Sequence, residues 1–319
     1  MKKIAFLLAI VITLLSCDKS SKIEREIGEI PVEVSVKRFD LAYKNTTPFE
    51  LQDLKKEYPY MFHEAYADSV WVGKMLDTLE RELFNEVYKA YPDFKEEKEE
   101  LKKFFQHVKY YYPDTSIPEV VTVTSDVDYE NQVIYSDKYL FICLDTYLGA
   151  NHKFYSGIQQ YLSQSFTKDY IIVDVASSFA ISKVPAPQNR AFLSYIIYYG
   201  KKLYLESLLI PEKTDAQRLK YTTDEYAWAE ANEDMIWKYF MEEEVLFSTK
   251  SKLLERFVFP APFSKFYRPI DNESPGRLGV YIGSKIVASY MKNNDVSLQQ
   301  MLTTSAQEIF NNAHYKPRK

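Results

Sequence analysis

Apolar and polar positions divide the chain into a short region that favours strands and a long region that favours helices. Residues 30–40, IPVEVSVKRFD, alternate apolar and polar side chains, which predicts a half-buried strand. PEVVTVT at 118–124 and QVIYSDKYLFICL at 132–144 predict two more strands, which we expect to be neighbours. Between these regions, residues 67–90 and 94–112 carry apolar residues at helical spacing.

After the loop at 149–157 the pattern is helical almost to the end of the chain. An earlier helix start is predicted at Thr47–Glu50, because Leu51 and Leu54 open an apolar stripe there. The helices predicted after the loop span residues 158–165, 168–182, 188–208, 223–246, 249–256, 276–293, 297–302 and 305–312. This order of elements predicts an α+β fold, with a small N-terminal mixed sheet and a predominantly helical C-terminal half. A subdivision near residue 150 is an alternative, but we favour one globular domain over residues 30–319.

The N-terminus predicts export and lipidation. Two lysines precede an apolar run from Ile4 to Leu15, which is too short to span a bilayer and lies where a secretory signal belongs. The run ends in Leu-Leu-Ser-Cys, which fits the lipobox that lipoprotein signal peptidase recognises. We therefore predict a signal peptide over residues 1–16 and a lipid anchor on the sulfur of Cys17, followed by a polar tether over 17–29. An ordinary cleaved signal peptide and an N-terminal anchor helix are the alternatives, and a cysteine at the cleavage point argues against both.

Composition narrows the classes of protein that fit. Aromatic residues make up 16% of the chain and there are only 8 glycines, which favours a rigid, helix-rich body over a glycine-rich β-sandwich. The formal net charge of −5 argues against a nucleic-acid partner. Cys143 lies in the apolar stretch YLFICL, so we predict that it is buried. Because it is the one cysteine beyond Cys17, no internal disulfide can form and packing must hold the fold.

The chain carries no metal-binding motif with the required spacing. Its four histidines, His63, His107, His152 and His314, form no HExxH motif and no pair at i and i+4. A catalytic zinc site needs about three nitrogen, sulfur or carboxylate ligands, so only residues far apart in sequence could supply one. We expect no metal, no cofactor and no catalytic residue.

Two groups of polar residues were weighed as possible catalytic sites. Ser177 and Ser178 lie near Asp174, but no G-x-S-x-G elbow and no neighbouring histidine accompanies them. The carboxylates Glu230, Glu233 and Asp234 could pair as acid and base. We interpret these three residues as charges on a helix surface.

Glycine and tyrosine patterns indicate packing. Gly279 and Gly283 lie on one face of the predicted helix and would let another element approach closely, which we favour over a ligand cleft. Residues 200–202, Gly-Lys-Lys, lack the upstream glycine of a phosphate loop and lie inside a helical run. Tyrosines at 110–112 and 195–199 could stack on sugars, but at helical spacing we expect them in the core.

Several separated blocks together resemble one known family, the GldB-type gliding motility lipoproteins of Bacteroidota. After the lipobox, the blocks that carry the resemblance are IPVEVSVKRFD, KKEYPYMF, YYGKKLYL, WAEANEDMIWKYF, PAPFSKF, SPGRLGVYIGSKIVASYM and HYKP. They cover nearly the whole mature chain. The resemblance implies a role in gliding motility, association with the machinery that works with the type IX secretion system, and no enzymatic activity.

The family is also distantly similar to a group of predicted zinc-dependent proteases with HExxH on an active helix. The shared part would include the helix of SPGRLGVYIG and the closing YKP. If the active helix corresponds to the stretch after Ile171, this chain has Val173-Asp174-Val175-Ala176-Ser177-Ser178 there, without either histidine or the glutamate. The similarity therefore implies a zincin-like fold that has no metal motif and is kept as a binding scaffold.

The residues after Cys17 bear on where the protein lies. Asp18 directly follows the cysteine, but the acidic run typical of surface-exported lipoproteins of Bacteroidota is missing. We expect a periplasm-facing, lipid-anchored protein, with inner and outer membrane both open. Its expected partners are the membrane and other proteins of the gliding and secretion machinery. The alternatives are an envelope hydrolase with a site built from distant residues and a glycan- or peptide-binding lipoprotein.

Overall fold

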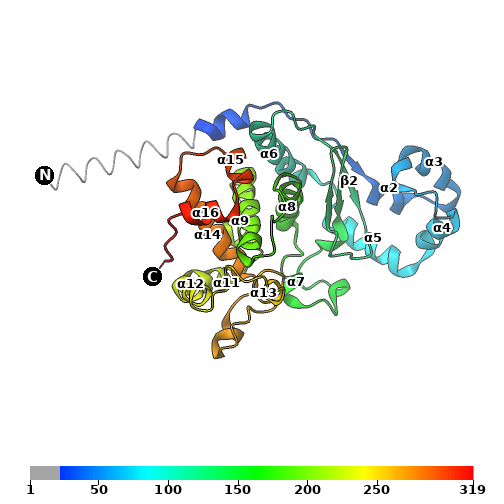
Figure 1. The fold of residues 1–319 in the computed structure, drawn as a ribbon. Helices are drawn as coiled ribbons and strands as arrows, with labels where there is room; N and C mark the ends of the chain where they lie inside the picture. Colours follow the sequence, from blue (N-terminus) through cyan, green and yellow to red (C-terminus); the bar gives the residue numbers. More distant parts are fainter. Residues whose placement is uncertain (1–21, 319) are drawn as a thin grey trace, which may run out of the picture.

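The computed structural model describes residues 22–318, and it confirms the predicted α+β class (Figure 1). One small sheet stands between two groups of helices, those of residues 39–90 on one side and those of residues 95–111 and of the C-terminal half on the other (Figure 1). The predicted signal peptide and the predicted lipid anchor at Cys17 lie outside the described residues.

The sheet has four strands in the order β1-β2-β4-β3. The strands are β1 Val36–Arg38, β2 Glu119–Val123, β3 Val133–Tyr135 and β4 Tyr139–Cys143. β1 and β4 both run parallel to β2, and β3 runs antiparallel to β4. The predicted mixed sheet is therefore confirmed, as is the expected proximity of the strand regions 118–124 and 132–144.

Two strand predictions need correction. The strand expected over 30–40 is short, because helix α2 (Phe39–Asn45) begins directly after β1. The Arg38 guanidinium turns back onto the Asp40 carboxylate at 2.7 and 2.9 Å, which fixes the chain at this change of direction. Residues 132–144 form a hairpin of two strands, because Ser136 bonds through its backbone N–H and its hydroxyl to the carbonyl of Tyr139 and closes a turn.

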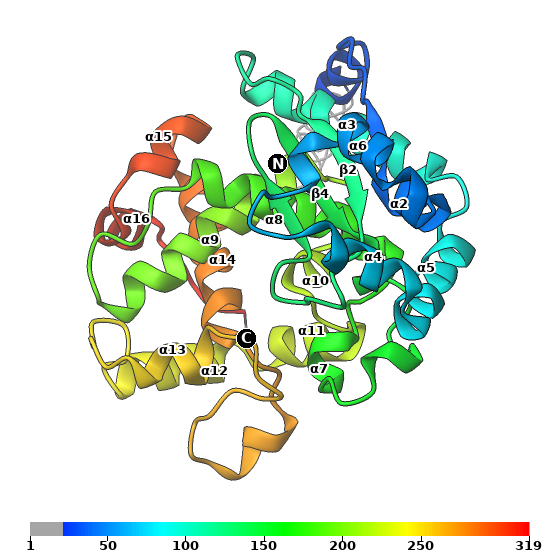
Figure 2. The same ribbon diagram turned by 90° about the vertical axis from the view of Figure 1, so that its right-hand side faces the viewer.

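Successive residues of the strands enter two different apolar clusters. Val120, Leu140 and Ile142 belong to the larger cluster, which includes the helices of the C-terminal half. Val121 and Cys143 point to the opposite face and belong to a smaller cluster with the N-terminal helices. Cys143 is buried as predicted, and burial raises the pKa of its thiol to about 12. Both faces of the sheet are thus covered, as Figure 2 shows from the side of the N-terminal helices.

The N-terminal helices α2, α3 (Leu51–Glu57), α4 (Asp68–Leu76) and α5 (Thr78–Ala90) cover the smaller cluster. Leu51 and Leu54 are buried as the predicted stripe requires. The helix expected over 67–90 is interrupted at Asp77, whose side chain caps α5 by accepting from the N–H groups of Leu79 and Glu80. One sequence pattern therefore produces two helices.

The other face of the sheet is covered by α6 (Lys95–Tyr111) and α8 (Ile171–Lys183), with α9 (Phe192–Leu209) and α14 (Leu278–Asn293) behind them (Figure 1). α9 and α14 touch through glycine. A Cβ atom on Gly283 would lie 1.9 Å from the Ile196 carbonyl oxygen, and one on Gly200 would lie 2.3 Å from the Gly283 carbonyl oxygen. The predicted role of Gly283 in close helix packing is confirmed.

The remaining helices surround this pair. They are α7 Gln160–Ser163, α10 Asp215–Leu219, α11 Thr223–Ala231, α12 Glu233–Glu242, α13 Lys252–Phe257, α15 Leu298–Thr303 and α16 Ala306–Asn312. The helix predicted over 223–246 is split at Asn232, whose side-chain amide donates back to the Trp228 carbonyl and ends α11. α10 was not predicted, because its five residues are too few to show a periodic pattern.

The last part of the predicted tether is packed on the domain. Residues 22–28 are helical, and Ile27 is only 1% exposed. The side-chain amide of Gln106, on α6, donates to the carbonyls of Gly28 and Ile30 at 2.8 and 3.0 Å. Within residues 22–318, no helix has the length and apolar character that crossing a membrane requires.

Candidate functional site

α8 and α9 bring a group of polar side chains together beside the core. Asp174 lies in the first turn of α8 and is largely buried. Its Oδ2 atom accepts a hydrogen bond of 2.9 Å from the Tyr147 hydroxyl, and its Oδ1 atom lies 2.6 Å from Lys220 Nζ. Both oxygens of this carboxylate therefore have a partner within the domain.

Glu206 of α9 is the most deeply buried carboxylate of this group, with 2% of its surface exposed. Burial raises its pKa to about 7, while the positive charges of Lys202 and Arg277 and a hydrogen bond with Ser177 lower it. At neutral pH the Glu206 carboxyl therefore lies between its neutral and charged forms.

Lys202 and Arg277 supply positive charge near Glu206. Lys202 Nζ lies 5.4 Å from the ring centre of Tyr199, and burial lowers the pKa of Lys202, an effect that Glu206 opposes. Arg277 directly precedes α14 in a left-handed conformation (φ 61°) and donates from Nη1 to the Leu219 carbonyl at 2.7 Å. We call Asp174, Lys202, Glu206, Lys220 and Arg277 the buried charge cluster.

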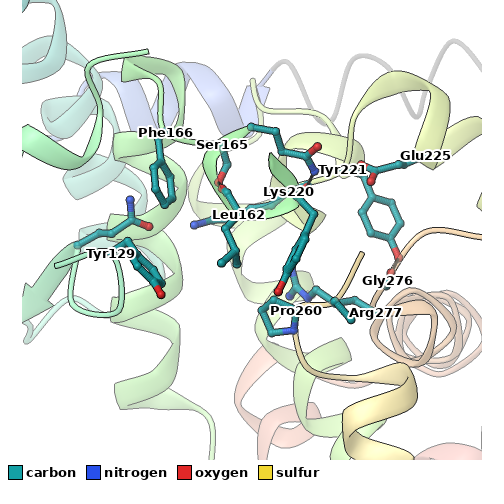
Figure 3. A pocket seen from close by; sticks show the side chains of 14 residues that line it. Tyr129, Leu162, Ser165, Phe166, Lys220, Tyr221, Glu225, Pro260, Gly276 and Arg277 are labelled. Atoms are coloured by element: carbon teal, nitrogen blue, oxygen red, sulfur yellow. Dashed lines mark hydrogen bonds between the residues drawn. The ribbon is translucent and has the colours of Figure 1, made fainter. Parts of the chain in front are cut away.

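A pocket of about 160 Å³ opens beside the buried charge cluster (Figure 3). Lys220 and Arg277 line it, whereas Asp174, Lys202 and Glu206 are not among its lining residues. The lining residues are Tyr129, Gln132, Tyr161, Leu162, Gln164, Ser165, Phe166, Lys220, Tyr221, Glu225, Pro260, Ala261, Gly276 and Arg277. Two cations of the cluster therefore face the pocket, whereas the Glu206 carboxyl does not line it.

The pocket walls are bonded to each other. The Tyr221 hydroxyl donates to the Gly276 carbonyl, as the close-up shows (Figure 3). A Cβ atom on Gly276 would lie 2.2 Å from the Ala261 carbonyl oxygen, so these two segments meet only because residue 276 is glycine. Gln164 donates from Nε2 to the Lys220 carbonyl at 3.3 Å. These contacts hold the pocket open in a defined shape.

A second, larger cavity of about 540 Å³ lies between α4, α5 and residues 126–127. Lys74 pairs there with Asp126 at 2.6 Å and with Glu80 at 3.2 Å. Burial, followed by the negative charge of Asp126, raises the pKa of Glu80. Lys74 thus offsets part of the negative charge of this groove.

The four histidines lie in different parts of the described chain. His107 bonds to the Lys103 carbonyl and to Glu24, and His152 lies 3.6 Å from Glu86. His63 and His314 are exposed. Among residues 22–318, no three or more His, Cys, Asp or Glu side chains are placed so that they could hold a metal ion together.

The interpretation of Glu233 as a surface charge is wrong. Glu233 is buried, and its carboxylate accepts hydrogen bonds of 2.7 Å from the hydroxyls of Tyr281 and Tyr315. Glu230 and Asp234 do form partly exposed ion pairs, with Arg318 and Lys238. The three carboxylates therefore do not act as one group. A single sequence cannot show this difference, because Glu233 is distinguished only by residues 48 and 82 positions away.

The Gly-Lys-Lys sequence and most of the clustered tyrosines are structural, as expected, whereas Tyr110 is exposed. Tyr111, Tyr112, Tyr198 and Tyr199 pack against the larger core cluster. Lys201 Nζ donates to the carbonyls of Leu302 and Thr304, at the end of α15. These lysines therefore lie inside α9 and form no phosphate loop.

Sequence analysis missed the principal residues of the pocket and the charge cluster. Lys202 and Arg277 lie within the blocks YYGKKLYL and SPGRLGVYIG, which were singled out only for their resemblance to a family. Glu206 and Lys220 lie in no motif. The charged residues Lys202 and Glu206 inside the apolar run of α9 were the available signal of a buried charge cluster. An unpaired charge there would be costly to bury, so each charge requires a partner.

Comparison with known proteins gives one match. A family model described as gliding motility protein GldB matches residues 20–317. No curated protein and no solved structure matches the chain. The matched range contains the sheet, the buried charge cluster and the pocket.

Proposed function

The chain belongs to the GldB family of gliding motility lipoproteins, and from this we propose that it is a noncatalytic protein of the cell envelope that supports the gliding machinery and the associated type IX secretion system. It acts as a binding scaffold, held to a membrane through Cys17 and facing the periplasm. Membership of the family supports involvement in gliding. The way in which Asp174 on α8 and Glu206 on α9 are paired and buried supports the absence of catalysis.

The observation that carries the noncatalytic role is how Asp174 and Glu206 are used. The Asp174 carboxylate is occupied by Tyr147 and Lys220. Glu206 is buried and does not line the pocket. A general base must lie within hydrogen-bond distance of a substrate, or one water away from it. These carboxylates instead balance the charge of cations that belong to the same domain.

The packing of residues 22–30 supports a short anchor. Four residues separate Cys17 from residue 22, where the described part of the chain begins, and the five steps between them span at most about 18 Å when extended. A lipid on Cys17 would therefore hold α6 and its neighbours close to the membrane surface. A scaffold that must contact membrane-embedded partners benefits from this position.

A hydrolase remains the second candidate function, because a carboxyl with a pKa of about 7 can act as a general base. It would require the pocket to open toward Glu206. The glycan-binding alternative loses its original support, because the tyrosine clusters at 110–112 and 195–199 pack largely against the core.

Complementation of a deletion strain separates these functions. Cells without the gene should lose gliding on glass and show a changed secreted-protein profile, and a plasmid copy should restore both. A Glu206→Gln variant keeps the shape of the side chain but removes the ionisable group. If the protein is noncatalytic, this variant should restore gliding when its abundance matches wild type. Loss of gliding at normal abundance would favour the hydrolase.

The anchor is tested with a Cys17→Ala variant, which should be released from the membrane fraction and should restore gliding poorly. Protease treatment of intact cells tests the expected orientation. A periplasm-facing protein should survive this treatment and be degraded only after the outer membrane is opened. Degradation in intact cells would place it on the cell surface.

A further inference from the structure

We propose that the pocket lined by residues of α7 and α11 and by Arg277 binds a carboxylate group carried on a short apolar or aromatic stem. This assigns a ligand class to the pocket and deepens the scaffold function proposed above, on which it rests. The argument uses the charge at the pocket, the size of the pocket and the character of its walls.

Arg277 is the residue that selects the ligand charge. Within residues 22–318 it forms no ion pair, and its Nη1 atom donates to the Leu219 carbonyl. The other cation at the pocket, Lys220, is already paired with Asp174 at 2.6 Å. Arg277 therefore has donor groups left for a ligand, and a planar guanidinium matches the two oxygens of a carboxylate.

The remaining charges favour one negative charge over two. Two cations, Lys220 and Arg277, and one anion, Glu225, line the pocket. Asp174 offsets Lys220 from behind the pocket. A phosphate dianion would meet too little positive charge here and would be repelled by Glu225. Among the described lining residues, Arg277 is then the cation without an ion-pair partner, and its single charge matches that of a carboxylate monoanion.

The pocket is small and partly aromatic. About 160 Å³ corresponds to roughly five water molecules at about 30 Å³ each, so the pocket admits a carboxylate and a short stem but no extended chain. Tyr129 and Phe166 lie together on one side of the pocket, and Leu162 lies near its centre (Figure 3). Such walls favour an apolar stem next to the charged group.

Two sources carry this chemistry, the C-terminal residue of a peptide and a small organic acid. Titration of the full-length protein in detergent distinguishes them. The probes are acetyl-Ala-Phe with a free carboxylate, its C-terminal amide, 3-phenylpropanoate and inorganic phosphate. Ligand-observed NMR measures the binding of each probe. We expect the free carboxylate peptide to bind with a dissociation constant on the order of 1 mM and the amide to bind at least about tenfold more weakly. Comparable binding of 3-phenylpropanoate would support the proposal with a small acid as the source.

Two variants attribute binding to this pocket. Arg277→Gln should weaken carboxylate binding at least about tenfold. Both proteins are measured in the same detergent, so that the probe partitions into micelles to the same extent. Glu225→Gln should strengthen it by about fivefold, because a repelling charge is removed while its hydrogen bond to the Thr222 N–H is kept. The second variant gains affinity, so an unfolded protein cannot imitate the result. Arg268→Gln, at an exposed residue outside the pocket, serves as the control.

Three outcomes would overturn the proposal. They are equal binding of peptide acid and amide, preference for phosphate over both carboxylates, and no binding of any carboxylate probe to a folded protein. These assays use purified protein and are independent of gliding. Carboxylate binding by a protein that proves catalytic would contradict the scaffold function alone, whereas failure of binding with normal complementation by Glu206→Gln would contradict the carboxylate site alone.

Discussion

The Tyr281 hydroxyl donates a hydrogen bond of 2.7 Å to Oε2 of Glu233, and so joins α14 to the first residue of α12. The second oxygen of the carboxylate accepts from the Tyr315 hydroxyl and from the backbone N–H of Arg318, both in the C-terminal tail. Three of the blocks that resemble the family, WAEANEDMIWKYF, SPGRLGVYIGSKIVASYM and HYKP, therefore meet at one buried carboxylate.

The tail contact predicts a measurable loss of stability in Tyr315→Phe. The change removes one of the donors to the buried Glu233 carboxylate and should lower the free energy of unfolding by about 1 to 3 kcal/mol. Urea denaturation followed by tryptophan fluorescence measures it. Tyr267→Phe, at an exposed tyrosine, is the control and should change little. Equal stability of the two variants would mean that the tail does not hold α12 in solution.

The contact between α9 and α14 predicts opposite effects for two glycine-to-alanine changes. Gly283→Ala should destabilise the protein by about 2 to 3 kcal/mol or prevent folding, because the new methyl group would overlap the Ile196 carbonyl. Gly73→Ala in α4 meets nothing within 4 Å and should stabilise the helix by up to about 1 kcal/mol. Urea midpoints of the two variants test this. Tolerance of Gly283→Ala would mean that the helices lie farther apart than described.

The buried position of Glu206 predicts a pH dependence of stability. Its pKa is about 7 in the folded protein against 4.5 ordinarily, so between these pH values the folded state holds a proton that the unfolded state has lost. The free energy of unfolding should therefore fall as pH rises from 4.5 through 7, by at most about 3 kcal/mol from this group, and level off above about pH 8.

Comparison of wild type with Glu206→Gln isolates this contribution. Between pH 5 and pH 7.5 the free energy of unfolding should fall more in wild type than in the variant. A smaller decline should remain in the variant, because burial raises the pKa of Asp145 to about 6 in both proteins. Glu212→Gln, at an exposed residue paired loosely with Lys103, should retain the wild-type dependence. An identical pH dependence in all three proteins would show that Glu206 is charged throughout, held so by Lys202 and Arg277.

The end of β1 predicts a large cost for Asp40→Asn. Asp40 is buried and accepts from both the Arg38 guanidinium and the Thr122 hydroxyl. Loss of its charge leaves the guanidinium unpaired next to the core and should cost about 3 kcal/mol. Asp53→Asn, which breaks an exposed pair with Lys56, should have little effect. Thermal unfolding compares them, and similar melting temperatures would contradict a structural role for the VKRFD sequence.

Much of the fold was accessible from the sequence because it depends on local pattern. The 3.6-residue periodicity located α6, α8, α9, α14, α15 and α16 to within a few residues. Boundaries failed where one side chain interrupts a pattern, as Asp77 does before α5 and Asn232 does before α12. A continuous apolar pattern does not reveal these interruptions, because the capping side chains are ordinary polar residues in a polar position.

Only part of the candidate site could be predicted from the sequence. The sequence placed Asp174 and Ser177 on a helix and showed that the zinc-protease motif is absent there. It did not show that Lys220 neutralises Asp174 or that Arg277 faces a pocket. Lys220 lies 46 positions after Asp174, and the pocket lining extends from Tyr129 to Arg277, so no spacing rule reaches that far.

By itself, then, the sequence determined the helical and strand segments, the α+β class and the family, because these follow from residue order over short distances and from blocks that can be compared one by one. The tertiary structure alone decided which charged residues are buried and what partners they have. Glu206, Glu225 and Glu233 are chemically identical along the chain. They differ in partners and in access to the pocket because burial and long-range packing set the surroundings of each carboxyl group.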